Sequence, residues 1–244
     1  MRHDALVPHG DLVLKGMRDP VTEADIASER HIVGRIRERY PDDAIYAEEE
    51  TRDDARDGLT WYVDPIDGTV NFSQSHPFFA VSIALFDGQT PLVGVVHAPR
   101  LQETFAAGRG LGTTLNGTPV NVSSKKALIE AVLATGFSYQ RHELVDNNVD
   151  HFNDFILNVR GLRRCGSAAL DLAYTAAGRL DGYWEPHLRP FDVAAGALLV
   201  LEAGGVVTDM SGGDDWLHGG KIAAAPKTMH ALILSQLADP GGDP

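Results

Sequence analysis

The chain has 244 residues, of which 43% are hydrophobic and 23% are charged, and its formal net charge is -13 at pH 7. This length supports one large domain or two small lobes with substantial cores. The acidic balance disfavours direct binding of nucleic acid, because a negative field repels phosphate backbones. A small phosphorylated ligand would need bound cations that reverse the charge locally.

The cellular location is predicted from what the sequence lacks. No apolar run approaches the roughly 18 residues that span a bilayer, and the N-terminus has no sustained apolar core of signal-peptide type. Cys165 is the one cysteine, so no intrachain disulfide can form. We therefore expect a cytoplasmic protein without a membrane partner, in which Cys165 is a buried or half-buried thiol rather than a nucleophile.

The first 125 residues are predicted to combine one helix with strands and hairpins. Apolar residues near one face indicate a helix over 22–39, which the Pro41 turn ends. Period-two patterns and turn residues then predict strands over 44–47, 60–64, 80–86, 92–98 and 103–107, with an Asn-Gly turn at 116–117.

After about residue 125, strands are predicted to alternate with helices. The strands are expected over 132–136, 181–185, 206–209 and 221–225, and the helices over 142–159, 167–179, 192–203 and 228–237. The pattern predicts a mixed α/β (α+β) protein. We expect two lobes, residues 1–125 and 126–244, packed as one unit.

The segment DPIDGT places Asp64 and Asp67 three residues apart with Pro65 between them. Proline fixes its own φ and favours an extended Asp64, so one turn holds both acids. Two carboxylates this close cannot both stay ionised cheaply without a cation, and Mg²⁺ prefers oxygen ligands. These residues alone leave two interpretations open: a metal site, or an Asx-type turn that faces water.

The neighbouring polar residues also have two interpretations each. Gly68 would let a ligand approach the backbone, and a helix that starts at Thr69 would direct free N–H groups at a phosphate, but Gly-Thr could simply complete the turn. Taken alone, Asp192 favours a helix N-cap, and Thr22 to Asp25 fits a capping box. The acidic run 48–50 would then be a solvated edge.

Four blocks in the same order resemble the inositol monophosphatase family. WYVDPIDGTVNF (61–72) is similar to its first signature and PFDVAAGALLVLEAGG (190–205) to its second, while DPVTEAD (19–25) and YAEEE (46–50) match two further blocks. The similarity runs from about Lys15 to Ala225. The resemblance implies the layered αβαβα sandwich of the lithium-inhibited, Mg²⁺-dependent sugar phosphatases.

The resemblance also implies a catalytic centre with two to three Mg²⁺ ions. The metal ligands would be the side chains of Glu48, Asp64, Asp67 and Asp192 and the main-chain carbonyl of Ile66, with Asp64 bridging two ions. The catalytic residues would be Thr69, Asp25 and Glu48: Thr69 would orient the attacking water, and Asp25 would hold water near a third ion. Two such ions about 3.5–4 Å apart can clamp an in-line displacement.

The substrate-binding residues that the resemblance implies are Asp67, Gly68, Thr69, Gly166, Ser167, Ala168, Glu185 and Asp192. The backbone of Gly68 and Thr69 would contact phosphate. Residues 166–168 would line the sugar, and Glu185 would accept hydrogen bonds from its hydroxyls.

The expected reaction is hydrolysis of inositol monophosphate (myo-inositol 1-phosphate) to inositol and phosphate, because GSAALDLAYTAAGRLDGYWE (166–185) is most like the inositol group. A histidinol-phosphatase, a fructose-1,6-bisphosphatase and a 3′-phosphoadenosine nucleotidase share the same metal core and stay as alternatives. A regulatory protein that binds the transcription machinery is the alternative of another class. The resemblance also implies inhibition by Li⁺ and a homodimer.

Three departures from the family pattern carry expectations of their own. Phe191 stands where tryptophan is usual, and we expect it to keep an aromatic packing role. Ala47 replaces a usual glycine before Glu48. Fourteen residues precede Lys15, where the family has a helix, so either the start is set late or a packing helix is missing.

Overall fold

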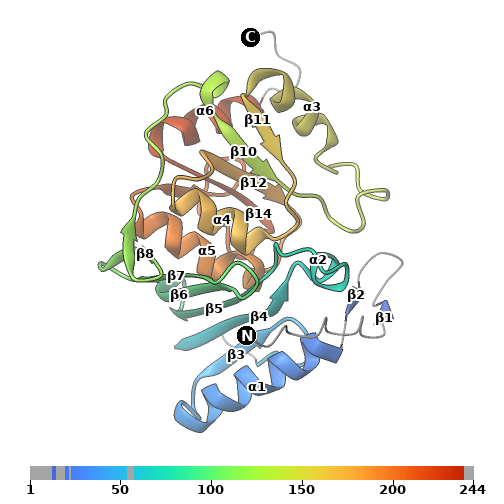
Figure 1. The fold of residues 1–244 in the computed structure, drawn as a ribbon, viewed down its shortest axis with the longest axis vertical. Coiled ribbons are helices and arrows are strands. Elements are labelled where there is room, and N and C mark those ends of the chain that lie inside the picture. The colour runs from blue at the N-terminus through green and yellow to red at the C-terminus, as the bar shows by residue number, and fades with distance from the viewer. Residues whose placement is uncertain (1–12, 15–19, 22, 54–57, 239–244) are drawn as a thin grey trace, which may run out of the picture.

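The structure, a computed structural model, describes residues 13–14, 20–21, 23–53 and 58–238 (Figure 1). Thr22 of the predicted capping box and the segment around Lys15 lie outside these ranges. The first described elements are two short antiparallel strands, β1 (Val13–Leu14) and β2 (Pro20–Val21). Throughout the described ranges, every helix is too short or too polar to cross a membrane.

The first sheet is formed, among the described residues, by seven strands in the order β3-β4-β5-β6-β7-β8-β9. They are β3 (Ala44–Ala47), β4 (Leu59–Asp67), β5 (Ala80–Asp87), β6 (Thr90–Ala98), β7 (Glu103–Gly108), β8 (Gly112–Leu115) and β9 (Thr118–Val120). β3 and β4 are parallel, and the other neighbours are antiparallel. The predicted Asn-Gly turn joins β8 to β9, with φ of 49° at Asn116 and 79° at Gly117, as a type I′ turn requires.

The second sheet contains, in the part of the chain that is described, five strands in the order β11-β10-β12-β14-β13. They are β10 (Val132–Thr135), β11 (Gly161–Arg163), β12 (Gly182–Pro186), β13 (Val206–Thr208) and β14 (Lys221–Ala225). β10 is parallel to both β11 and β12. Strand β11 was not predicted, because three residues are too few to show a period-two pattern.

Helices lie outside both sheets and between them. They are α1 (Glu23–Arg39), α2 (Thr69–Ser73), α3 (Val149–Asn158), α4 (Ala168–Ala176), α5 (Pro190–Glu202) and α6 (Lys227–Ala238). α1 packs on β4, α4 and α5 fill the space between the sheets, and α3 and α6 cover the far side of the second sheet (Figure 1). This order of layers confirms the predicted αβαβα sandwich.

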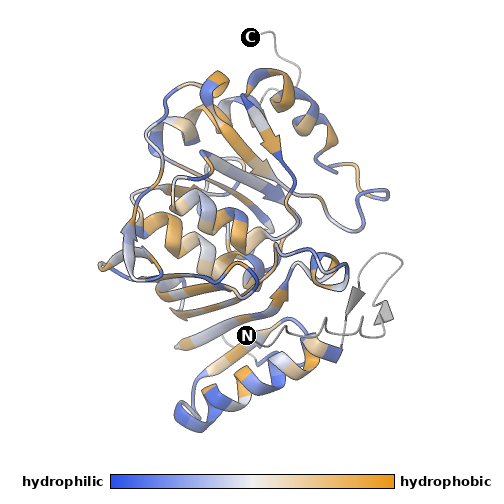
Figure 2. Cartoon of the chain, viewed as in Figure 1, coloured by the Kyte–Doolittle hydropathy of each residue, from blue (hydrophilic) through white to orange (hydrophobic). Residues whose placement is uncertain are grey.

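The largest core lies between the sheets, where α5 is buried over most of its length. Figure 2 shows orange over much of α4 and α5, whereas α1 is mostly blue. α5 comes from the second half of the sequence but packs against strands of the first sheet. The strands of the first sheet lie within residues 44–120, and those of the second lie within residues 132–225. The division of the chain into lobes 1–125 and 126–244 stays a prediction.

The helix predicted over 142–159 was wrong at its start, because α3 begins only at Val149. Asn148 before it has φ of 69°, and its side-chain amide is buried, donating to Thr135 Oγ1 at 2.8 Å and to the Gly136 carbonyl at 2.7 Å. These tertiary hydrogen bonds hold Asn148 in a left-handed conformation that a continuous helix cannot include.

Candidate active site

Strand β4 delivers Asp64 and Asp67 to the interior. Its pairing with β5 is regular up to Asp64, which lies opposite Ser82, and then shifts register before Asp67. Pro65 falls in this irregular stretch, where no ladder hydrogen bond is required of it. The Ile66 N–H donates to Asp64 Oδ1 at 3.0 Å, so the Asx-type contact exists. The alternative of a water-facing turn was wrong, because Asp64 is 2% exposed and Asp67 is 9% exposed.

The chain turns at Gly68 into the short helix α2. Gly68 has φ of 97°, and its absent Cβ would lie 3.1 Å from the Gly166 carbonyl oxygen, so both conformation and space favour glycine. The hydroxyl of Thr69, the first residue of α2, is 3.2 Å from the Ile66 carbonyl and 3.4 Å from Asp25 Oδ1. Asp25, 44 residues away on α1, is thereby placed beside Thr69.

Helix α5 brings Asp192 to the same region. Asp192 is not the N-cap that it resembles when taken alone, because the helix begins at Pro190 and Arg189 is the N-cap. Asp192 is the third helical residue, and its side chain accepts the backbone N–H of Arg189 at 2.6 Å. Ser82, the strand partner of Asp64, donates to the Phe191 carbonyl at 3.3 Å. This bond fastens the start of α5 next to Asp64.

Four carboxylates from three parts of the sequence share this region. Burial raises the pKa of Asp64 well above its usual value, and the charges of Glu48, Asp67 and Asp192 raise it further. Burial also raises the pKa of Asp192, with the charge of Asp67 as the next cause. The cluster therefore stores mutual repulsion that a bound cation would relieve.

The turn that follows Glu48 is held by a residue that the sequence interpretation missed. Glu29 on α1 is fully buried, and its two oxygens accept the backbone N–H groups of Glu49, Glu50 and Thr51 at 2.6–2.9 Å. The buried stripe of α1 is Asp25, Glu29, Val33 and Ile36. A search for apolar periodicity passes over its two acids, although their spacing of four residues places them on one face.

Asp67 connects the two halves of the chain. Its Oδ2 accepts the Ser167 hydroxyl at 2.5 Å and the Ala169 N–H at 2.8 Å, and Ser167 is also the N-cap of α4. These donors limit the rise in pKa that burial causes, leaving the pKa of Asp67 at about 6. The predicted substrate segment 166–168 therefore lies directly against a predicted metal ligand.

Asn71 is a second residue that the sequence interpretation missed. Its side-chain amide donates to the Phe78 carbonyl at 2.7 Å and to the Cys165 carbonyl at 2.8 Å. It thus joins α2 to the segment that precedes Gly166.

The environment of Cys165 agrees with the prediction that its thiol is not a nucleophile. Burial raises the pKa of the thiol to about 12, and a thiol that stays protonated is a poor nucleophile.

Comparison with known proteins identifies the family. The family model described as "Inositol monophosphatase family" matches residues 7–240. The chain belongs to the inositol monophosphatase family.

Individual members of this family are similar over most of their length. An inositol-1-monophosphatase of Synechocystis sp. is 44% identical over 90% of this chain and 77% of the relative. The Nus factor SuhB of Pseudomonas aeruginosa is 45% identical over 91% of this chain and 84% of the relative. The structure of an inositol monophosphatase from Anabaena (Nostoc) sp. PCC 7120 has a TM-score of 0.87, 40% identity, and coverage of 89% of this chain and 88% of that one.

Members of the inositol monophosphatase family generally use divalent metal ions, and the donors present here fit such an ion. The four acids and the Ile66 carbonyl supply only oxygen, which suits Mg²⁺, and burial followed by the charges of the other three acids raises the pKa of Asp64, an effect that a cation would offset. In the described residues, however, no three His, Cys, Asp or Glu side chains are already arranged to hold an ion. The carboxylates would have to turn toward one.

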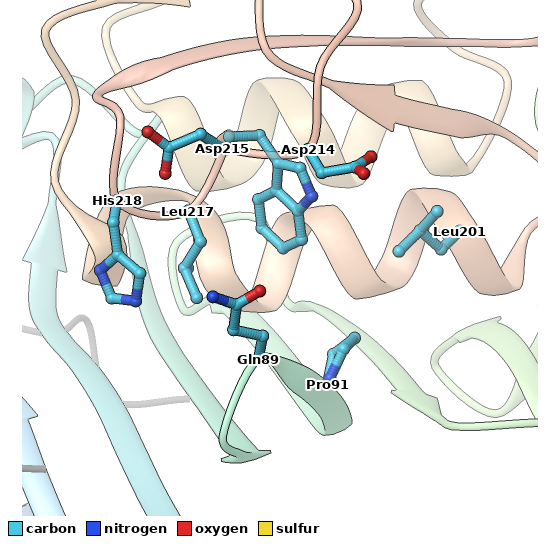
Figure 3. A pocket seen from close by; sticks show the side chains of 8 residues that line it. Gln89, Pro91, Leu201, Asp214, Asp215, Leu217 and His218 are labelled. Carbon is cyan, nitrogen blue, oxygen red and sulfur yellow. The ribbon is translucent and has the colours of Figure 1, made fainter. Parts of the chain in front are cut away.

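A cavity of about 530 Å³ lies elsewhere (Figure 3). Its lining includes Leu201 near the end of α5, together with Trp216 and His218. Leu201 is nine residues from Asp192, or about 13 Å along the helix. This cavity is therefore separate from the carboxylate cluster.

Proposed function

We propose that this protein is a Mg²⁺-dependent phosphomonoesterase that hydrolyses myo-inositol 1-phosphate to inositol and phosphate. The observation that supports it most is the convergence of Glu48, Asp64, Asp67 and Asp192 in one region, next to the Gly68–Thr69 turn. When bound there, Mg²⁺ would neutralise the carboxylates, activate a water and stabilise charge on the phosphoryl group.

The residues of the chain would orient the reacting groups. The Thr69 hydroxyl can donate a hydrogen bond to the Ile66 carbonyl or to Asp25, which leaves its lone pairs to accept a hydrogen bond from the attacking water. The hydrogen bond from Ile66 fixes Asp64. The Ser167 hydroxyl and the Ala169 N–H fix the Asp67 carboxylate through Oδ2.

The choice of an inositol phosphate rests on Glu185 and on a relative. The Glu185 carboxylate lies near enough to raise the pKa of Asp192, so a hydroxyl on the leaving alcohol could reach it. The Staphylococcal enzyme SaIMPase-II, 28% identical with a TM-score of 0.77 over 87% of this chain and 82% of that one, has a structure described as bound to inositol monophosphate. Another structure of that enzyme is described as bound to 2′AMP, so the alternative substrates named above stay in the test.

The test is a panel of phosphomonoesters assayed with Mg²⁺, with EDTA and with Li⁺. The panel contains myo-inositol 1-phosphate, histidinol phosphate, fructose 1,6-bisphosphate and 3′-phosphoadenosine 5′-phosphate. We expect the highest kcat/KM for the inositol ester, no activity in EDTA, and inhibition by Li⁺. Equal or better turnover of histidinol phosphate would overturn the substrate assignment, and activity that survives EDTA would overturn the metal assignment.

A regulatory role in transcription is the second candidate function. The observation that favours it is the 45% identity to a relative named Nus factor SuhB. Affinity capture with an Asp64→Asn variant separates this role from catalysis. Recovery of RNA polymerase with both the wild type and the variant would support it, and recovery with neither would contradict it.

We further propose that the protein is a cytoplasmic homodimer. Sedimentation velocity of the purified chain tests the oligomeric state, and a single species of about 26 kDa, the mass of one chain, would contradict the dimer. Fractionation of cells that express the untagged protein tests the location.

A further inference from the structure

Strand β12 presents Tyr183 and Glu185 on one face. Side chains two residues apart on a strand point the same way, and Tyr183 belongs to the core between the sheets. Trp184 points to the opposite side, where its ring stacks on Phe155 with centroids 4.1 Å apart. The strand therefore directs the Glu185 carboxylate toward the side of the second sheet that α4 covers.

One oxygen of Glu185 is already engaged. The Tyr183 hydroxyl donates to Oε2 at 2.5 Å, and Tyr183 is fully buried. Burial, followed by the charge of Glu185, raises the pKa of Tyr183 well above its usual value, so this hydroxyl stays a donor. Oε1 receives no hydrogen bond from any residue in the described ranges.

The carboxylate can take its observed position because residue 136 is a glycine. A Cβ on Gly136 would lie 2.0 Å from Glu185 Oε2 and 2.3 Å from Oε1, and real Cβ atoms do not approach so closely. The Gly136 backbone has little freedom to retreat, because its carbonyl accepts the buried Asn148 amide at 2.7 Å. Thr135, next to it, donates to the Trp184 carbonyl at 2.6 Å. Glu185 is thus held between the Tyr183 hydroxyl and the Gly136 backbone.

We propose that Tyr183 and Gly136 are positioning residues that set substrate selectivity by orienting Glu185. Tyr183 engages Oε2, so Oε1 is the oxygen that a substrate hydroxyl can approach without competing with the tyrosine. The site would then favour phosphate monoesters of polyols, in which a free hydroxyl beside the ester donates to Oε1. This inference rests on the proposed function, since it assumes that the carboxylate cluster hydrolyses phosphomonoesters.

The test compares two substrates that share the phosphate but not the hydroxyls. The ratio of kcat/KM for myo-inositol 1-phosphate to that for p-nitrophenyl phosphate is measured with Mg²⁺ for the wild type and for Tyr183→Phe. We expect the variant to lower this ratio about tenfold, mainly through a higher KM for the inositol ester, because Glu185 loses the hydrogen bond from Tyr183 that orients its carboxylate.

Tyr174→Phe is the matched control. Its hydroxyl donates to a carboxylate in the same way, to Glu103 Oε2 at 3.0 Å, but Glu103 is outside the carboxylate cluster and the second sheet. We expect the selectivity ratio of this variant to stay within about twofold of the wild type. An equal fall in kcat/KM for both substrates in Tyr183→Phe, or no fall for either, would overturn the inference.

Two further variants test whether Tyr183 acts through Glu185. If it does, Tyr183→Phe should add little to the loss of selectivity that Glu185→Gln causes alone, and additive losses would contradict the mechanism. Gly136→Ala, checked for folding by circular dichroism, should lower the ratio at least as much as Tyr183→Phe. If the wild type hydrolyses neither ester with Mg²⁺, the proposed function itself fails, a result distinct from any change in ratio.

Discussion

Two regions of this protein bury carboxylates in opposite ways. Glu29 on α1 is fully buried and accepts three backbone N–H groups, so its charge is matched by donors from the chain. Asp64 is as deeply buried but accepts one N–H, from Ile66, and faces other carboxylates. The first arrangement stabilises a turn, whereas the second leaves a negative charge that an external cation can satisfy. Burial of an acid alone therefore does not indicate a metal site.

The largest expected effect is on activity, from Asp64→Asn. The amide keeps the shape but removes the charge that would hold Mg²⁺, so we expect kcat/KM for the best phosphomonoester to fall about a thousandfold. Because the substitution also removes repulsion, we expect the metal-free variant to unfold in urea at the same or a higher midpoint than the wild type. Full activity of Asp64→Asn would show that the charge of Asp64 is not needed for catalysis, and would contradict the contrast with Glu29.

The complementary change, Glu29→Ala, should act on stability. It leaves the partly buried backbone N–H groups of Glu49, Glu50 and Thr51 without their acceptor, and we expect the free energy of unfolding to fall by about 3 kcal/mol. Urea denaturation followed by circular dichroism measures this. A loss below about 0.5 kcal/mol, the range of ordinary surface substitutions, would show that Glu29 does not hold the turn.

Addition of Mg²⁺ should separate the Asp64 variant from the Glu29 variant. A ligand that binds only the folded state stabilises it by about 2.7 kcal/mol at about 100 times its Kd. We expect Mg²⁺ to raise the Tm of the wild type and of Glu29→Ala, and EDTA to reverse the rise. The same titration should leave the Tm of Asp64→Asn nearly constant. A rise of equal size in Asp64→Asn would place the binding of Mg²⁺ outside the carboxylate cluster.

The smallest expected effect concerns Asn71, which links α2 to the segment that precedes Gly166. Asn71→Ala removes the hydrogen bonds to Phe78 and Cys165, and we expect a loss of about 1–2 kcal/mol in the free energy of unfolding. Activity should fall less than in Asp64→Asn, because every acid stays in place. A loss of activity as large as that of Asp64→Asn would assign Asn71 to the chemistry rather than to the link.

Most of the fold could be predicted, because the patterns that specify it are local. The strands 44–47 and 221–225, the hairpin turn at Asn116 and the layer order agree with the sequence interpretation. The start of α3 could not be predicted, because the conformation of Asn148 depends on hydrogen bonds to the distant strand β10. Glu29 was missed for a similar reason: its acceptor role is visible only when the turn after β3 packs on α1.

By itself, the sequence determined the family, the oxygen-rich set of candidate ligands and the order of the secondary structure elements, because residue type, spacing and periodicity are local properties. The tertiary structure alone decided which of these residues meet. Asp25 and Thr69 are 44 residues apart, and Ser167 and Asp67 are 100 apart. It also decided that Asp64 accepts a single backbone N–H whereas Glu29 accepts three, because the donors around a buried charge come from whichever segments pack against it.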